Sequence, residues 1–374
     1  MPPQTRRVSV LGPAYLDRVI RCDVPLLPAE MGMVLDASVD GRIEPGEGPA
    51  VVDPNGSTLA IDPPDGWPGP WGIVRVARAL TPGRPRWRHR VRAVGWRDDL
   101  GGMGPGYAAA LGGVLIHALG TTQDPISEVV ATNLAARAIT SRPIRVEHPA
   151  DWTLLLSSGP HGDKLPIGFR GCHAGVKSLN PYLDEVCELR VVASLPNRLA
   201  AEALNAPGSA TRMFAPALRN MLDTDPPIAA FARRIDLLSC NRREWELLAN
   251  PLALFAQIPA VAITDGPLGA KLYYKGVSGP ETHHQPAFPR ASPPVDTNRA
   301  GEAFGATLIS ALLDGGWTTG PLGGALAASA MRRASAAAAL VLDRADFGFP
   351  TPGEVDEALR VGRVAPSTPR GPSP

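Results

Sequence analysis

The chain has 374 residues, a formal net charge of +1 at pH 7 and a hydrophobic content of 44%. This balance is typical of an ordinary globular protein and gives the chain no overall attraction to nucleic acid or to a membrane. It has no apolar leader and no window of 18 uninterrupted apolar residues, so we expect a cytoplasmic protein without a membrane span. The cysteines form no CxxC pair, which predicts free thiols and no structural zinc site; they are Cys22, Cys172, Cys187 and Cys240.

Short apolar strands alternate with helical segments along most of the chain. We predict strands at residues 7–11, 189–193, 235–239, 260–264 and 271–276, and a β-hairpin at 151–158 and 165–169. We predict helices after the glycine turn at 101–104 and at residues 127–139, 198–204 and 325–340. This alternation is typical of a parallel sheet with helices on both faces, in which functional residues gather at the carboxyl ends of the strands.

Composition and pattern divide the chain into three parts. Residues 1–30 and 98–365 form the predicted α/β core, and residues 31–97 form a divergent insert or lid. Residues 366–374, which are rich in proline and serine, form a predicted disordered tail.

Within the insert, five arginines recur with a period of two, so they share one face if the segment is a strand. They are Arg84, Arg86, Arg88, Arg90 and Arg92. This pattern fits an exposed edge strand that arginine protects from aggregation, a lid that binds an anionic substrate, or a nucleic-acid patch. We favour the exposed strand over the lid, and both over the patch. We take the isolated Lys164, near the hairpin turn, as a surface charge.

Five stretches carry a resemblance to a known family. They are GPAYLDRVIRCD (12–23), GGMGPGYAAAL (101–111), NRREWELL (241–248), ITDGPLGAKLYYKG (263–276) and DTNRAGEAFGATL (296–308). They occur in the order used by the PfkB (ribokinase-like) carbohydrate and nucleoside kinases, which the chain resembles over roughly residues 7–360. The resemblance implies a three-layer α/β/α sandwich with a mostly parallel sheet and a small β-lid. It also implies ATP-dependent phosphorylation of a hydroxyl on a sugar-like or nucleoside-like molecule, and it leaves a homodimer open because lid strands pair between subunits in some relatives.

The stretch Arg299, Ala300, Gly301 and Glu302 stands where the family has Gly-Ala-Gly-Asp. By this resemblance the backbone amides form an anion hole for the transferred phosphoryl group, and Glu302 is the general base. A second interpretation is that Glu302 complements the helix dipole and pairs with Arg299, which lowers its pKa and weakens it as a base. The chain would then be a catalytically impaired homologue that binds a nucleotide or sugar as a regulatory protein.

The resemblance also assigns nucleotide contacts. Thr264, Gly266 and Gly269 would approach the phosphates, because only glycine lets the backbone come so near. Ser335, on the alanine-rich helix, would lie beside the adenine. The alternative for the glycine loop is a plain turn between two strands.

Two further pairs would hold metal ions. By the resemblance, Asn241 and Glu244 serve Mg²⁺ through water, although the same spacing also fits a helix capping box. Asp296 and Thr297 occupy a position at which some relatives bind a monovalent cation such as K⁺.

The substrate contacts implied by the resemblance are Asp17, which would hold sugar hydroxyls, and the glycine turn at Gly101 and Gly102. The family often has Lys and Asn in this turn, where this chain has Met103 and Gly106. The missing polar contacts point away from ordinary ribose or hexose and, with the arginines, toward an anionic acceptor.

Overall fold

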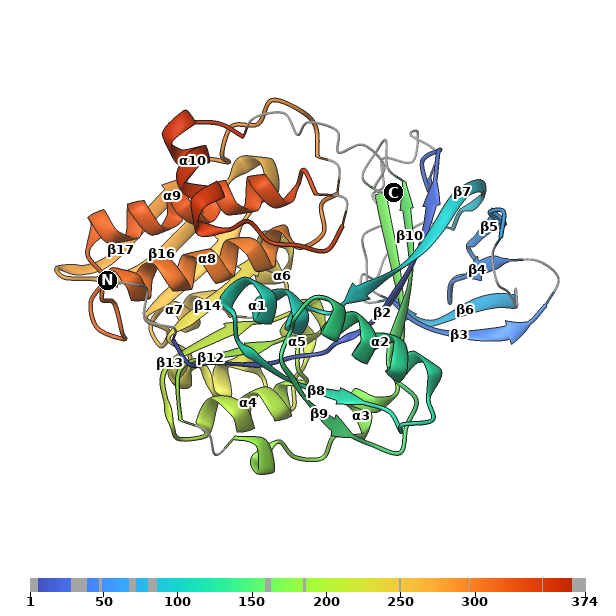
Figure 1. Ribbon diagram of the computed structural model, residues 1–374, viewed down its shortest axis with the longest axis horizontal. Helices are drawn as coiled ribbons and strands as arrows, with labels where there is room; N and C mark the ends of the chain where they lie inside the picture. The colour runs from blue at the N-terminus through green and yellow to red at the C-terminus, as the bar shows by residue number, and fades with distance from the viewer. Residues whose placement is uncertain are drawn as a thin grey trace.

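The computed structural model of the chain describes residues 6–27, 39–46, 49–66, 72–79, 86–158, 163–183, 186–248, 250–294, 296–344 and 346–364 (Figure 1). The tail predicted at 366–374, Arg84 and the turn of the predicted hairpin at 159–162 lie outside these residues. Within them, no helix combines the length and apolar character needed to cross a bilayer.

Nine of the described strands form one large sheet in the order β17-β16-β15-β14-β13-β12-β1-β8-β9. The sheet is parallel except at β16 and β17, which pair antiparallel along one edge. The predicted apolar strands all lie in it or in the barrel described below. The bounds are β1 Val8–Leu11, β8 Val114–Leu119, β9 Ser141–Arg145, β12 Cys187–Ala193, β13 Ser209–Ala215, β14 Leu237–Asn241, β15 Ala260–Thr264, β16 Ala270–Gly276 and β17 Gly279–Gln285.

Helices cover both faces of this sheet, which makes three layers. Alternate residues of one strand enter opposite cores: Val191 packs under α1, α8 and α9, whereas Val192 packs on the α4 side, and both are fully buried. Figure 1 shows α1, α8 and α9 on one side and α4 on the other. The helices are α1 Met103–Leu111, α2 Pro125–Ala136, α3 Cys172–Gly175, α4 Asn197–Asn205, α5 Leu218–Leu222, α6 Arg242–Glu246, α7 Pro251–Phe255, α8 Ala300–Asp314, α9 Gly324–Val341 and α10 Pro352–Val361.

The other described strands close into a small barrel beside the sheet, in the order β10-β11-β3-β6-β4-β5-β7-β2. Its interior is a separate apolar core that includes Leu59, Trp87, Val91, Leu156 and Ile167. The long strand β7 runs from this core to the glycine turn at Gly101, so it connects the barrel with the sheet. The strands are β2 Tyr15–Cys22, β3 Val39–Pro45, β4 Ala50–Val52, β5 Thr58–Asp62, β6 Gly72–Ala79, β7 Arg88–Gly101, β10 Trp152–Ser158 and β11 Asp163–Phe169.

The arginine repeat lies on the outer surface of this barrel. Trp87 and Val91 are buried in the barrel core, while Arg86, Arg88, Arg90 and Arg92 are exposed. The predicted alternation is thus confirmed for the described arginines. The edge-strand interpretation was wrong, because β7 pairs with both β5 and β2. None of the four described arginines belongs to the lining of the pocket at the start of α8.

Candidate active site

A pocket of about 260 Å³ lies where the barrel meets the start of α8. Its lining brings together residues that are far apart in the chain and were predicted as substrate and catalytic positions: Asp17, Gly101, Gly102, Arg299 and Glu302. Asp17 comes from β2, the glycines from the end of β7, and the other two from the start of α8. The chain therefore places its predicted base and its predicted substrate-binding carboxylate in one cavity.

The glycine turn is imposed by close packing. A Cβ atom at Gly101 would lie 2.5 Å from Cγ of Asp17. Gly102 has φ +88°, and a Cβ there would lie 2.1 Å from the carbonyl oxygen of Pro13. Any side chain at either position displaces Asp17 or the backbone that leads into β2, so the turn holds Asp17 in place.

The carboxyl group of Asp17 is buried beside a second acid. Burial and the charge of Asp99 raise the pKa of Asp17 to about 7, while Arg170 and Arg299 act in the opposite direction. A carboxylate with this pKa changes its protonation state near neutral pH. When it is ionised, both of its oxygens accept hydrogen bonds from hydroxyls, whereas protonation turns one of them into a donor.

The start of α8 depends on an arginine in a left-handed conformation. Arg299 precedes the helix with φ +67°, which costs roughly 1 kcal/mol or more for a residue other than glycine. Its buried guanidinium lies 3.1 Å from Asp99 and 3.7 Å from Asp296, and it stacks over the ring of Phe347. Arg299 thus forms ion pairs with Asp99 and Asp296, and these interactions offset the strain of its left-handed backbone.

Glu302 lies in the first turn of α8, where it is partly buried in the pocket wall. Burial raises its pKa, and its own backbone hydrogen bond, Arg299 and Lys164 lower it by smaller amounts. One sequence-based interpretation was that Arg299 lowers the pKa of Glu302 and so weakens it as a base. Arg299 does lower this pKa, but burial raises it by more, and the net shift of the pKa is upward. Gly106 of α1 lies against the side chain, because a Cβ there would be 3.0 Å from Cγ of Glu302.

Lys164 was taken as a surface charge, and this was wrong. Its side chain is 16% exposed, and Nζ donates to Asp296 at 3.2 Å and to the amide oxygen of Asn298 at 2.7 Å. The strand β11 alternates, with Leu165 and Ile167 in the barrel core and Lys164 on the pocket side. The period-two alternation of β11 could have shown that Lys164 lies on the face opposite Leu165 and Ile167. The sequence alone did not show that this face of the strand meets the start of α8.

Asp296 and Thr297 do not fit a monovalent-cation site. The Asp296 carboxylate already faces Lys164, Arg97 and Arg299. Burial alone would raise its pKa, but Lys164, the backbone amide of Asn298 and Arg299 outweigh burial and lower it. Thr297 is exposed. A cation site needs uncompensated oxygen ligands, and here protein cations occupy that role.

The predicted nucleotide loop follows β15 at the carboxyl edge of the sheet. Gly266 has φ +51° and Gly269 has φ +91°, and a Cβ at Gly269 would lie 2.1 Å from the carbonyl oxygen of Gln285. Thr264 ends β15, and its hydroxyl donates to the carbonyl of Cys240 at 3.4 Å. On α9, the buried Ser335 donates to the carbonyl of Pro286 at 3.2 Å. None of these residues lines the 260 Å³ pocket as far as the chain is described, so the predicted nucleotide positions form a separate group.

Asn241 and Glu244 form a capping box at the start of α6. The Asn241 side chain accepts from the Glu244 amide at 2.9 Å, and the Glu244 carboxylate accepts from the Asn241 amide at 2.9 Å. Burial raises the pKa of Glu244 to about 7; Asn241 lowers it and the charge of Glu302 raises it further. This coupling connects the capping box electrostatically with the predicted base.

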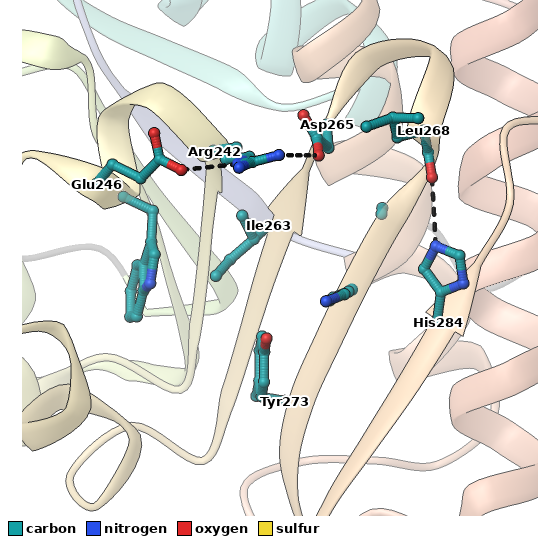
Figure 2. Close-up of a pocket in the computed structure, with 10 residues that line it drawn as sticks. Arg242, Glu246, Ile263, Asp265, Leu268, Tyr273 and His284 are labelled. Carbon is teal, nitrogen blue, oxygen red and sulfur yellow. Dashed lines mark hydrogen bonds and ion pairs between the residues drawn. The ribbon is translucent and has the colours of Figure 1, made fainter.

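A larger cavity, of about 560 Å³, lies beyond the nucleotide loop on the face of the sheet opposite α8. Figure 2 shows Arg242 between the carboxylates of Glu246 and Asp265, and His284 against the carbonyl of Leu268. The cavity shares Asp265 and Leu268 with the loop but contains neither Glu302 nor Asp17. Size alone therefore does not mark the candidate active site.

The comparisons with known proteins identify a family and a fold. A model described as "pfkB family carbohydrate kinase" matches residues 110–353. A ribokinase structure from Thermotoga maritima is 18% identical, with a TM-score of 0.60 over 95% of this chain and 99% of that chain. A nucleoside kinase from Methanocaldococcus jannaschii is 14% identical, with a TM-score of 0.62 over 95% and 98%. A nucleoside kinase from Burkholderia thailandensis, solved with inosine, is 14% identical, with a TM-score of 0.63 over 95% and 97%.

No curated protein sequence matches the chain. At these low identities the solved structures establish the fold and nothing finer. The predicted ribokinase-like sandwich with its mostly parallel sheet is confirmed, and the described strands beside that sheet close into a barrel.

Proposed function

Because the chain belongs to the pfkB family of carbohydrate kinases, we propose that it transfers the γ-phosphoryl group of ATP to a hydroxyl of a sugar-like or nucleoside-like molecule. The observation that carries this proposal is the shared pocket of Glu302 and Asp17 at the start of α8. A partly buried carboxylate at a helix N-terminus, in the same pocket as a second carboxylate that can hold hydroxyls, suits proton removal from an alcohol.

In this proposal each group of the pocket has one task. Asp17 accepts hydrogen bonds from acceptor hydroxyls and orients the molecule. Glu302 takes the proton of the attacking hydroxyl, and its raised pKa brings it nearer to the operating pH than an ordinary glutamate. The amides of Ala300 and Gly301, at the positive end of α8, stabilise the negative charge that develops during transfer.

The donor nucleotide would bind at the separate group of Thr264, Gly266 and Gly269, with Ser335 nearby. Mg²⁺ would neutralise charge on the phosphates, and Asn241 and Glu244 would hold it through water. Asn241 and Glu244 fit this ion, because the negative charge of Glu302 helps to raise the pKa of Glu244. A divalent cation beside these two carboxylates would relieve their repulsion. No monovalent cation enters the proposal.

The acceptor class follows from the pocket and from the similar proteins. Those proteins include ribokinases and a nucleoside kinase solved with inosine, which support both sugars and nucleosides as acceptors. Lys164 and Arg170 line the same pocket, so sugar acids and phosphorylated sugars belong among the candidates.

A second candidate function is a binding protein that has lost turnover. The observation that favours it is Arg299, which replaces the first glycine of the family's anion hole and is held by Asp99 and Asp296. In this case ATP or the sugar binds and no phosphoryl group moves.

The test is ADP formation with Mg²⁺ across sugars, sugar acids and nucleosides, by the wild type, Glu302→Gln and the control Glu246→Gln. Glu246 is an exposed residue of α6. We expect Glu302→Gln to lose at least about a hundredfold in turnover, the typical contribution of a general base, and the control to match the wild type. ATP binding without turnover on any acceptor would contradict the kinase proposal and support the binding protein.

A further inference from the structure

Three buried side chains with metal-binding chemistry meet at the base of the β10–β11 hairpin. Asp151 immediately precedes β10, and Cys172 and His173 lie just after β11, in α3. Their exposed fractions are 2%, 0% and 8%. The cluster lies outside the lining of both cavities described above, and the proposed kinase reaction makes no use of it.

The distances among the three donors match the edges of a small coordination tetrahedron. Nδ1 of His173 lies 3.2 Å from Oδ2 of Asp151 and 3.6 Å from Sγ of Cys172. Zinc binds sulfur at about 2.3 Å and nitrogen or oxygen at about 2.1 Å, so tetrahedral angles place nitrogen about 3.4 Å from oxygen and about 3.6 Å from sulfur. All three ligand atoms lie within 4.8 Å of one another, so one ion can reach them without rearrangement of the backbone.

The charges of the donor set also balance. A thiolate and a carboxylate neutralise a divalent cation, and a neutral imidazole adds no charge, so the ion and its three protein ligands are together neutral. The partly exposed guanidinium of Arg170 lies 3.9 Å from Oδ2 of Asp151 at the edge of this cluster. The carboxylate is further held by the amide of Gly171, which donates to Oδ1 at 2.7 Å. Such backbone contacts orient ligands at metal sites.

The alternative is a hydrogen-bonded Asp151–His173 pair with an inert thiol beside it. This pair satisfies Nδ1 of His173, while the buried Nε2 has no partner among the described residues in either arrangement. In this alternative the thiol of Cys172 donates to Oδ1 of Asp151 at 3.7 Å, so the two interpretations differ in whether the sulfur is a hydrogen-bonded thiol or a metal-bound thiolate.

We propose that Asp151, Cys172 and His173 form a zinc site that fixes the base of the β10–β11 hairpin. The thiol of Cys172 releases its proton to solvent on binding, Nδ1 of His173 coordinates as a lone pair, and water completes the tetrahedron. The spacing of the cysteines predicted no such site, because Asp151 joins the cluster only through the fold. The hairpin carries Lys164 to the active-site pocket, so the ion would stabilise that wall of the pocket.

The experiment measures metal bound to the full chain, independently of any turnover. Protein stripped with a chelator under reducing conditions is dialysed against Zn²⁺ or Co²⁺, and bound metal is counted per chain. Co²⁺ adds a thiolate charge-transfer absorption if sulfur is a ligand. We expect one ion per chain and this absorption in the wild type, and the same in Cys187→Ser, a matched control because Cys187 is also buried and free.

We expect Cys172→Ser and His173→Ala to lose at least tenfold in affinity, with the cobalt–thiolate absorption absent in Cys172→Ser. Because either variant can misfold, the wild type is also unfolded thermally with and without one equivalent of Zn²⁺, and the ion should raise its melting temperature. Absence of bound metal in the wild type, an unchanged melting temperature, or full binding in both variants would overturn the site. Loss of binding in Cys187→Ser would do the same.

Discussion

Gly106 lies inside α1 directly against the proposed base, and Gly106→Ala tests whether packing holds Glu302 in place. The added Cβ would lie 3.0 Å from Cγ and 3.2 Å from Cβ of Glu302, and 3.3 Å from the ring of Phe349. Carbon atoms normally rest about 3.5–4.0 Å apart, so Glu302 or its neighbours must shift by several tenths of an ångström.

Two effects oppose each other in this variant. Alanine gains about 1 kcal/mol over glycine in a helix interior, whereas overpacking costs about 1–3 kcal/mol. We expect a net destabilisation of about 1 kcal/mol. Turnover should fall roughly tenfold, because a displacement of about 1 Å costs on the order of a hundredfold and this one is smaller.

The assay is ADP release at saturating ATP and acceptor, together with thermal unfolding. The control is Gly353→Ala in α10, where a Cβ meets no atom within 4 Å, and its turnover should equal that of the wild type. If Gly106→Ala keeps full turnover and the wild-type melting temperature, α1 does not position Glu302 and the packing argument is refuted.

Three more predictions concern the charged groups of the pocket. Arg299→Gly relieves roughly 1 kcal/mol of left-handed strain but removes the shortest ion pair of the buried Asp99, which keeps only Arg137 at 3.6 Å and Arg97 at 3.8 Å. Loss of a buried partner costs up to about 3–5 kcal/mol when no other partner remains, so denaturant unfolding should show a smaller net loss; a gain would contradict the ion-pair assignment. Lys164→Met should lower the melting temperature and raise KM for the acceptor. Lys164→Arg retains the positive charge and should change both quantities much less. If the two variants behave alike, the charge of Lys164 has no role. Because the pKa of Asp17 is raised from 3.8 to about 7 in the folded chain, Asp17 stays protonated there at pH values at which it is already ionised in the unfolded chain. Its contribution to stability therefore falls as pH rises from about 4 to about 7. Asp17→Asn should flatten that part of the stability–pH curve. In the wild type, kcat/KM should rise with pH through about 7 as Asp17 ionises. A wild-type kcat/KM that stays constant across this range would refute the role of Asp17 in binding the acceptor.

The elements and their order were predictable because they depend on local patterns. Helical spacing predicted the helix at residues 325–340, which is α9 and runs Gly324–Val341. Alternation predicted the hairpin of β10 and β11, and runs of apolar residues predicted the buried strands of the sheet. The grouping of Asp17, Gly101 and Glu302 followed from the resemblance, which places each at the carboxyl end of a strand or the start of a helix.

The partners of the charged side chains were not predictable, because they come from distant parts of the chain. Arg299 meets Asp99 across 200 positions of sequence, and Lys164 meets Asp296 across 132. Local spacing suggested that Arg299 pairs with Glu302, three residues away, but the left-handed conformation at Arg299 directs its guanidinium toward β7.

The sequence by itself determined the fold family, the helix and strand order, and the residue types at the candidate site, because these depend on period, capping and glycine placement along the chain. Only the tertiary structure decided which face of each strand meets the pocket. Closure of the barrel turns the arginine repeat to solvent and Lys164 toward the start of α8, and it sets Asp151 beside Cys172. A period of two defines two faces of a strand, but only packing against the rest of the molecule decides which face is buried.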